Sequence, residues 1–255
     1  MQKADSDSRT LNRFCDILNC FSKETSVLTL TEISRCVGLP KSTTFRFIEA
    51  LQSQGILNAD PHSHGYRLGY QLISWGSLAQ DSIDIRNDAA PFLNELTEKT
   101  GETSVLSMRF GNVGTWIEII ESRQPVRLNP KVGQSLQLHA GASSKVLIAF
   151  LPDKLLNEIL SGMRFEKYGK NSITDVEEFK KELQLIRNQG YATSFEETDI
   201  GAMGIAAPVY NHLHEVIAGI GIVAPMLRIP PEKMKEFAPV VVDAARKLSR
   251  RLGAL

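Results

Sequence analysis

Apolar residues near the start of the chain recur every three or four positions, which is the spacing of an amphipathic helix. The pattern predicts one helix over residues 8–23, a short one through 32–36 and a third over 41–54. Between the second and third, Gly38 can leave the helix with a positive φ, and Pro40 opens the next segment. Two short helices joined by a tight turn and covered by another helix predict a helix-turn-helix core.

The third predicted helix has two different faces. Its inner stripe consists of Thr44, Phe47, Ile48 and Leu51. Its outer face gathers hydrogen-bonding, aromatic and cationic side chains at the N-terminal end, namely Lys41, Ser42, Thr43, Phe45 and Arg46. Only the first two turns of a recognition helix reach base edges in the major groove, so this distribution predicts contact with DNA.

Two short apolar runs follow this helix, at residues 56–57 and 66–68, around a turn that contains Asp-Pro and Gly. They predict a β-hairpin, and a hairpin directly after a recognition helix is typical of a winged helix-turn-helix. His62, His64 and Arg67 lie where such a wing would contact phosphates. Without the hairpin, a helical hairpin with a solvated polar face would be the better explanation of the two helices.

The residues after the hairpin predict a second, larger part of the chain. A helix over 72–79 carries an apolar stripe that either seeks a partner chain or packs on the following domain. Beyond it, helices and strands alternate without the rhythm of a parallel sheet. We expect helices over 84–100, 141–150, after Pro152, from a capping box at Thr174 to Gly190, and from Pro230 to Leu252. The expected strands are 102–110, 113–121, 126–128, 135–138, 191–197, 203–210 and 215–223. This order predicts an α+β domain with a central antiparallel sheet.

Composition adds little to the prediction of a DNA-binding surface. Lys plus Arg equals Asp plus Glu at 29 each, and residues 1–70 hold eight basic against seven acidic side chains. Affinity for DNA must therefore come from local placement of charge and from doubling of the site in a dimer. No run approaches the roughly 20 apolar residues of a membrane span, and the N-terminus lacks a signal-peptide pattern, so we expect a cytoplasmic protein.

Motifs for catalysis and metal binding are incomplete. Residues 219–224 match the dinucleotide pattern G-x-G-x-x-A, but Pro225 follows where a helix should begin. Residues 141–145 resemble a nucleophile elbow with Lys in place of the last Gly, and 196–199 is an acidic run best explained as a polar loop. The three cysteines, Cys15, Cys20 and Cys36, form no Cys-x-x-Cys pair, and we expect reduced interior thiols rather than a metal site or a disulfide. We therefore predict no enzyme activity, no catalytic residues, no cofactor and no metal.

Four stretches occur in the order found in one known family. They are GLPKSTTFRFIEALQSQGIL at 38–57, LHAGASSKVLIAFL at 138–151, GYATSFEETDIGAMGIAAPVY at 190–210 and VIAGIGIVAP at 216–225. By these motifs the chain resembles the IclR family of bacterial transcription regulators over nearly its whole length. The resemblance implies a winged helix-turn-helix DNA-binding domain at 1–70, a linker helix used in dimerisation at 71–81 and a GAF-like effector domain at 82–255. It also implies binding to operator DNA as a homodimer or dimer of dimers, and a response to a small metabolite, often a carboxylate.

The resemblance also implies where the effector binds. Carried over by motif, the pocket residues are Leu128, Leu136, Ala142, Ser143, Ser194, Ala202, Gly204, Gly221 and Val223. Free N–H groups at the start of the helix at Gly141 suit a carboxylate; alternatively, the small residues there only allow the helix to pack closely on the sheet. Family members that bind small oxygenated acids place Ser or Cys where this chain has Gly204, Gly221 and Val223. The departure implies a larger ligand, whose apolar or aromatic body lies against Leu128, Leu136 and Val223.

The predicted function is that of a ligand-responsive DNA-binding regulator of a catabolic or metabolic operon. The alternative is a small-molecule sensor module that acts mainly through protein partners, and the near-neutral charge of the N-terminal region keeps this alternative open.

Overall fold

The computed structural model describes residues 2–22, 24–81 and 84–254 and divides into two compact units, Met1–Ile83 and Asp84–Leu255. The boundary predicted between linker helix and effector domain, at residue 82, lies outside the described residues. The division into three functional parts therefore stays a prediction.

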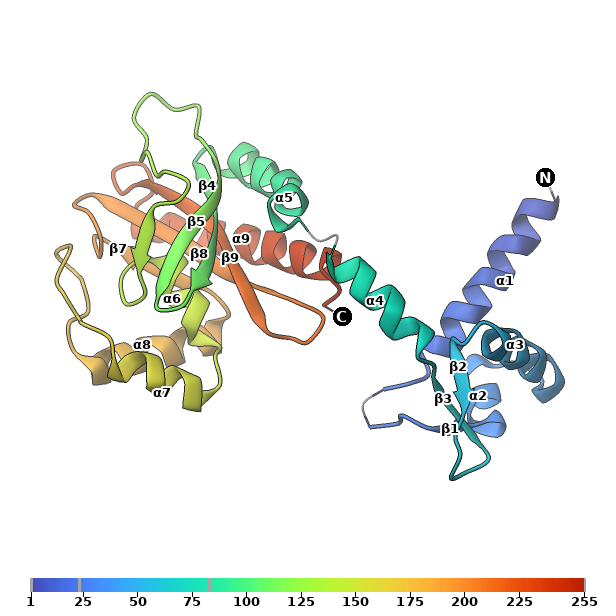
Figure 1. The fold of residues 1–255 in the computed structure, drawn as a ribbon. Coiled ribbons are helices and arrows are strands. Elements are labelled where there is room, and N and C mark those ends of the chain that lie inside the picture. The colour runs from blue at the N-terminus through green and yellow to red at the C-terminus, as the bar shows by residue number, and fades with distance from the viewer. Residues whose placement is uncertain (1, 23, 82–83, 255) are drawn as a thin grey trace. The chain divides into compact units, whose positions relative to one another are not determined.

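The first unit contains helices α1 (Gln2–Leu18), α2 (Leu30–Val37), α3 (Lys41–Ser53) and α4 (Gln71–Asp81) (Figure 1). Ile17 of α1, Ile33 of α2 and Ile48 of α3 are fully buried against one another, with Leu51 and Leu57 completing the cluster. The predicted inner stripe of α3 is thus the face that packs, and a small three-helix core holds the recognition helix in place.

Local chemistry sets the ends of α2. Thr29 is the N-cap and forms a capping box with Glu32, whose carboxylate accepts the Thr29 N–H at 2.8 Å. Gly38 ends the helix with φ 65°, as predicted, and Leu39 N–H donates back to Ser34 O at 3.1 Å. A glycine at this position tolerates the left-handed backbone that turns the chain into α3.

The predicted wing is present. Strands β2 (Leu57–Ala59) and β3 (Gly65–Leu68) form an antiparallel hairpin, and β1 (Leu28–Thr29) pairs with β3 on its other side. The short segment before α2 therefore supplies the third strand of this small sheet.

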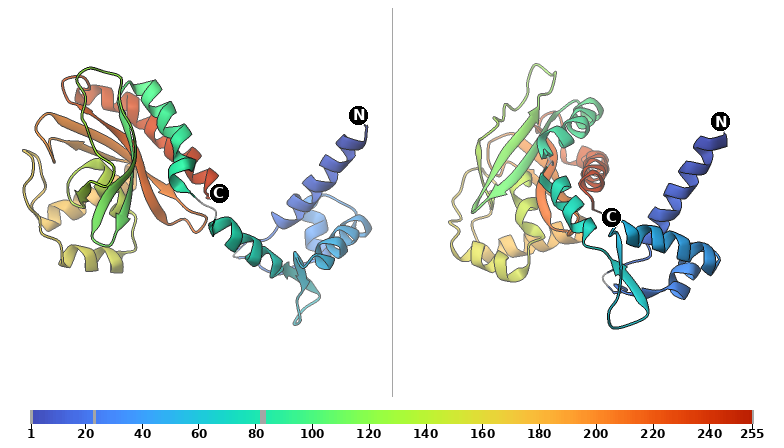
Figure 2. Two further views of the ribbon diagram at one scale, coloured as in Figure 1. Left: turned by 45° about the horizontal axis from the view of Figure 1, so that its top comes forward. Right: turned by 45° about the vertical axis from the view of Figure 1, so that its right-hand side comes forward.

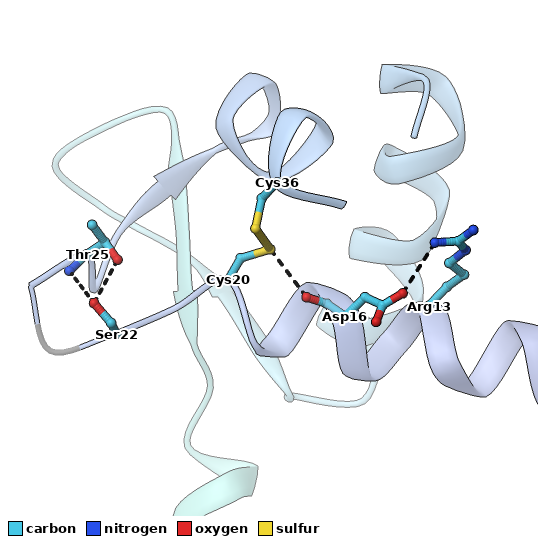
Figure 3. The surroundings of a disulfide bond; sticks show 6 residues. All are labelled: Arg13, Asp16, Cys20, Ser22, Thr25 and Cys36. Atoms are coloured by element: carbon cyan, nitrogen blue, oxygen red, sulfur yellow. Dashed lines mark hydrogen bonds and ion pairs between the residues drawn. A yellow bond between two sulfur atoms is a disulfide. The ribbon is translucent and has the colours of Figure 1, made fainter. Parts of the chain in front are cut away.

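The prediction of reduced, interior cysteines is wrong: two of the three form a disulfide, and the third is free but not interior. Cys20, just after α1, and Cys36, in α2, form a disulfide with Cα atoms 6.3 Å apart (Figure 3). Cys20 is half-buried and Cys36 is exposed, and Cys15 is a free, exposed thiol. The pairing was not visible in the sequence because only the packing of α1 across α2 brings residues 16 positions apart within bonding reach.

The second unit is built on one six-stranded antiparallel sheet of order β6-β5-β4-β9-β8-β7 (Figures 1 and 2). The strands are β4 (Thr103–Phe110), β5 (Val113–Ile120), β6 (Ser135–Gln137), β7 (Ala192–Phe195), β8 (Ala202–Tyr210) and β9 (Val216–Pro225). The two longest, β8 and β9, lie side by side near the middle, with Ala206 opposite Gly221. Residues 126–128, predicted as extended, belong to no strand.

Helices cover both faces of this sheet. On one face α5 (Ile85–Thr100) and α9 (Pro231–Arg251) pack on β4, β8 and β9. On the other face α6 (Ala142–Ala149) packs on the sheet and is buried at every position, with α7 (Asp153–Ser161) and α8 (Val176–Gln189) outside it. The N-cap of α8 is Asp175 rather than the predicted Thr174, because the Asp175 carboxylate accepts the N–H groups of Glu177 and Glu178.

Candidate functional site

The outer face of α3 presents all five side chains predicted to contact DNA. Lys41, Ser42, Thr43, Phe45 and Arg46 are exposed, and Phe45 keeps 41% of its surface open although it is aromatic. Thr44, between them, is buried and donates its hydroxyl to Pro40 O at 3.1 Å. The first turn of α3 holds no acidic side chain, so its helix start is open to an anion.

The wing places its polar residues in two different settings. His62 and His64 are exposed in the turn, which Asp60 orders by accepting the His62 N–H at 3.2 Å and the Ser63 hydroxyl at 2.8 Å. The Ser63 hydrogen bond lowers the pKa of the Asp60 carboxyl. Arg67 is half-buried at the base of the hairpin, where its guanidinium lies 6.0 Å from the ring centroid of Tyr70. The turn, more than Arg67, is thus free to contact a phosphate backbone.

The second unit contains a cavity of about 560 Å³ on the α6 side of the sheet. Its walls come from β5 and β6 with the loop between them, from β7 with the loop after it, from β8 and β9, from the start of α6 and from Tyr168. Eight of the nine predicted pocket residues line it: Leu128, Leu136, Ala142, Ser143, Ser194, Ala202, Gly204 and Val223. Residues far apart in sequence therefore meet at one hollow.

Gly221 is the exception: it was predicted to line the pocket, and that prediction is wrong. It is not part of the cavity lining, and a Cβ built on it would lie 2.0 Å from Ile205 O and 2.8 Å from Ala206 Cα. The glycine is needed for the close approach of β9 to β8, so it serves the sheet rather than the ligand space.

The start of α6 differs from the expectation of wholly free N–H groups. The Gly141 N–H donates to Glu197 Oε2 at 2.9 Å, while those of Ser144 and Lys145 donate to Gly141 O. Among the hydrogen bonds of the described chain, none uses the N–H groups of Ala142 and Ser143 or the Ser143 hydroxyl. These three donors, at the positive end of the helix dipole, remain for a ligand acceptor.

Polar and apolar side chains both line the cavity, and among its lining residues Asp199 is the only charged one. Asn129, Gln134 and Gln137 offer amides, and Trp116, Met203 and Leu136 offer apolar surface. An anionic ligand would therefore be held by backbone and neutral donors rather than by a cation. A body with apolar area fits the side formed by Trp116 and Leu136.

Sequence reasoning missed Trp116 and Tyr168 as lining residues, since neither lies in a motif used for the pocket. It also missed the buried ion pair of Lys145 with Glu197, at 2.6 Å. A signal existed: Lys145 stands in an apolar helix, and a buried ammonium requires an acidic partner such as the run at 196–199. That run is the polar loop expected, with Thr198 and Asp199 at the cavity.

Catalytic and metal-binding alternatives find no support in the described residues. The glycines at 219 and 221 lie inside strand β9, which no helix follows at Pro225. Residues 2–22, 24–81 and 84–254 hold no group of three His, Cys, Asp or Glu side chains placed to bind a metal. Within the same ranges, the helices are each too short or too polar to cross a membrane.

Two family models match this chain. The IclR helix-turn-helix domain matches residues 10–61, and the bacterial transcriptional regulator IclR C-terminal domain matches residues 78–250. The chain belongs to the IclR family. Both predicted halves of the fold, the winged helix-turn-helix and the C-terminal α+β domain, are those of this family.

Known relatives align over nearly the full chain. The HTH-type transcriptional regulator XynR of Escherichia coli is 34% identical over 96% of this chain and 97% of its own. KipR of Bacillus subtilis is 32% identical over 96% of this chain and 98% of its own. These relatives are transcription regulators and not enzymes.

Solved structures have the same fold. A putative IclR regulator from Silicibacter is 23% identical with a TM-score of 0.88, covering 96% of each chain. An IclR homologue from Microbacterium hydrocarbonoxydans, solved in complex with 4-hydroxybenzoate, is 24% identical with a TM-score of 0.60 and covers 95% of this chain and 98% of its own.

Proposed function

We propose that this IclR-family chain is a ligand-responsive transcription regulator that controls a catabolic or metabolic operon from the cytoplasm. The observation that carries the proposal is the exposed N-terminal end of α3, where Lys41 and Arg46 stand beside hydroxyl groups over a helix held rigidly by its buried face. Arg is suited to read guanine, and Lys to contact phosphate.

The effector that the cavity supports is a carboxylate with an apolar or aromatic body. The N–H groups of Ala142 and Ser143 and the Ser143 hydroxyl suit a carboxylate, and Leu128, Leu136 and Val223 suit the body. A cavity of about 560 Å³ is larger than a two- or three-carbon acid requires. The 4-hydroxybenzoate bound by the Microbacterium homologue has this combination of groups.

The regulator is proposed to act as a homodimer or a dimer of dimers. Helix α4 exposes Ile73 at 69%, Trp75 at 49% and Leu78 at 66%, which is a large apolar surface for eleven residues. Burial of such an apolar surface away from water is favourable, and packing against α4 of a second copy of the chain would bury it. Dimerisation also doubles the DNA contacts of a unit whose net charge is close to zero.

Replacement of Arg46 by Ala tests the proposal. We expect operator affinity to fall about 5- to 150-fold, the equivalent of about 1–3 kcal/mol, and preference at one base pair to relax. Glu49→Ala, exposed on the same helix but one turn further along, is the matched control and should not weaken binding. Fluorescence anisotropy with DNA from upstream of the chain's own gene measures both.

Repeating the same assay over a series of salt concentrations distinguishes a DNA-binding regulator from the alternative, a sensor that acts through protein partners. Phosphate contacts give a slope of about −0.9 per contact in a plot of log affinity against log salt. A flat slope, together with equal affinity of the Arg46 and Glu49 variants, would favour a sensor that acts through protein partners.

A further inference from the structure

Lys145 is the largest fully buried side chain of the second unit's cavity region, and it carries a charge. It stands in α6, which is buried at every position, and 1% of its side chain is exposed. Its Nζ donates to Glu197 Oε1 at 2.6 Å and to Glu182 Oε1, on α8, at 2.7 Å. Burying an ammonium is costly, and the cost is offset only by such close acceptors.

The two acceptors are not equivalent. Glu182 is on the outer helix α8 and is 24% exposed, and within the described residues its carboxylate pairs with Lys145 alone. Glu197 is 9% exposed and uses its second oxygen to accept the Gly141 N–H at the start of α6. Ala142 and Ser143, whose donors face the cavity, follow Gly141 directly.

Glu197 also connects the other walls. Thr198 and Asp199, which line the cavity, follow it in the chain. Its carbonyl oxygen accepts the Ser172 hydroxyl at 2.6 Å, and that same hydroxyl accepts the N–H of Tyr168, another lining residue, at 2.9 Å. The carboxylate of Glu197 thus holds the start of α6, while its backbone carbonyl joins the loop at 196–201 to the segment that carries Tyr168.

We propose that Glu197 is the positioning residue of the effector cavity: its ionised carboxylate, held by Lys145, fixes Gly141 and the 196–201 loop so that the walls stay closed around the ligand. The proposal rests on the effector site assigned above. It differs from a purely stabilising ion pair, because Glu182 would serve Lys145 equally well without contacting a cavity wall.

The titratable groups that face Glu197 are Lys145 and Glu182. Burial raises the pKa of the Glu197 carboxyl, and the nearby ammonium opposes that rise. Since the folded pKa is above the ordinary value of Glu, acidification protonates Glu197 before exposed carboxyls, which weakens its hold on Lys145 and Gly141. The cavity is therefore expected to loosen toward acidic pH.

The test compares Glu197→Gln with Glu182→Gln in the full chain, since each removes one carboxylate from Lys145. The chain has two tryptophans, Trp75 and Trp116, and Trp116 lines the cavity. In a Trp75→Phe background, acrylamide quenching of Trp116 reports access to the cavity without any ligand. We expect stronger quenching in Glu197→Gln at neutral pH, and wild-type quenching in Glu182→Gln.

The pH profile separates positioning from general stability. Quenching should rise on acidification in the parent and in Glu182→Gln, but should be high and independent of pH in Glu197→Gln. Equal quenching in both variants, or an unchanged pH profile in Glu197→Gln, would overturn the proposal. If Glu197→Gln fails to fold, Glu197→Asp, which keeps the charge but shortens the reach, replaces it in the comparison at neutral pH, where we expect stronger quenching than in Glu182→Gln; equal quenching in these two variants would overturn the proposal.

A ligand-binding experiment distinguishes failure of this proposal from failure of the proposed function. Calorimetry uses benzoate, 4-hydroxybenzoate and phenylacetate as probes. If one binds, its dissociation constant should rise about tenfold in Glu197→Gln, as expected for loss of about one oriented hydrogen bond, and much less in Glu182→Gln. Binding of none would contradict the assigned ligand class, while the quenching result would still decide the role of Glu197.

Discussion

Loss of the Cys20–Cys36 disulfide should destabilise the first unit. The bond closes a loop with a sequence separation of 16 residues. In the chain-entropy model, a loop of this length corresponds to about 3 kcal/mol at 25 °C, because the cross-link restricts the unfolded chain. The effect matters here because the core of this unit is small: within the described residues, five buried apolar side chains hold α1, α2, α3 and β2 together.

Hydrogen exchange followed by mass spectrometry measures this in the full chain. Amides of α2 and α3 should exchange up to about 100-fold faster after reduction, or in Cys36→Ser, if their exchange proceeds through opening of the whole unit. Peptides from the second unit should not change. Cys15→Ser is the control, since Cys15 is exposed and lies outside the disulfide.

Two results would refute the reasoning. One is equal exchange of α2 and α3 in oxidised and reduced protein. The other is a titration that finds three free thiols in protein kept under oxidising conditions, because the disulfide would then not form in solution.

Two further predictions concern the second unit. The fragment 84–255 contains the whole six-stranded sheet with helices on both faces, so it should fold alone and bind effector but not DNA. Circular dichroism measures its folding, and calorimetry measures its binding of effector. An unfolded fragment would show that α4 belongs to its core. In Gly204→Leu the new Cβ would lie in ordinary contact with Ala142 Cβ and Ile222 O at 3.5 Å and with Val223 Cγ1 at 3.8 Å, and because Gly204 lines the cavity we expect the added side chain to occupy ligand space. Effector response should be lost with DNA binding intact, measured by anisotropy with and without effector; loss of both would indicate a misfolded sheet.

Short-range features of this protein were predictable from the sequence. The left-handed Gly38 and the stripe of Thr44, Ile48 and Leu51 depend on neighbours within one or two helical turns. The strands of the large sheet were also predicted, because alternation of apolar residues and glycine-containing turns are local signals. Choosing Asp175 over Thr174 as the cap of α8 was not possible, because both residues suit the position.

Part of the cavity lining was also predictable from the sequence. Eight predicted residues came from motifs that resemble those of the IclR family, and they line one hollow. The role of Gly221 required the structure, since a glycine in a strand is compatible either with open space or with a close backbone contact, and only the distance to β8 decides between them.

Long-range pairings were decided by tertiary structure alone. Cys20 meets Cys36 because α1 crosses α2, and Lys145 meets Glu197, 52 residues away, because α6 packs beside the loop after β7. The sequence indicates that a buried charge requires a partner of opposite charge and that a thiol can pair with another thiol, but it does not indicate which distant residue is the partner. That choice depends on how the helices and strands pack, and packing is a property of the whole fold rather than of any single segment.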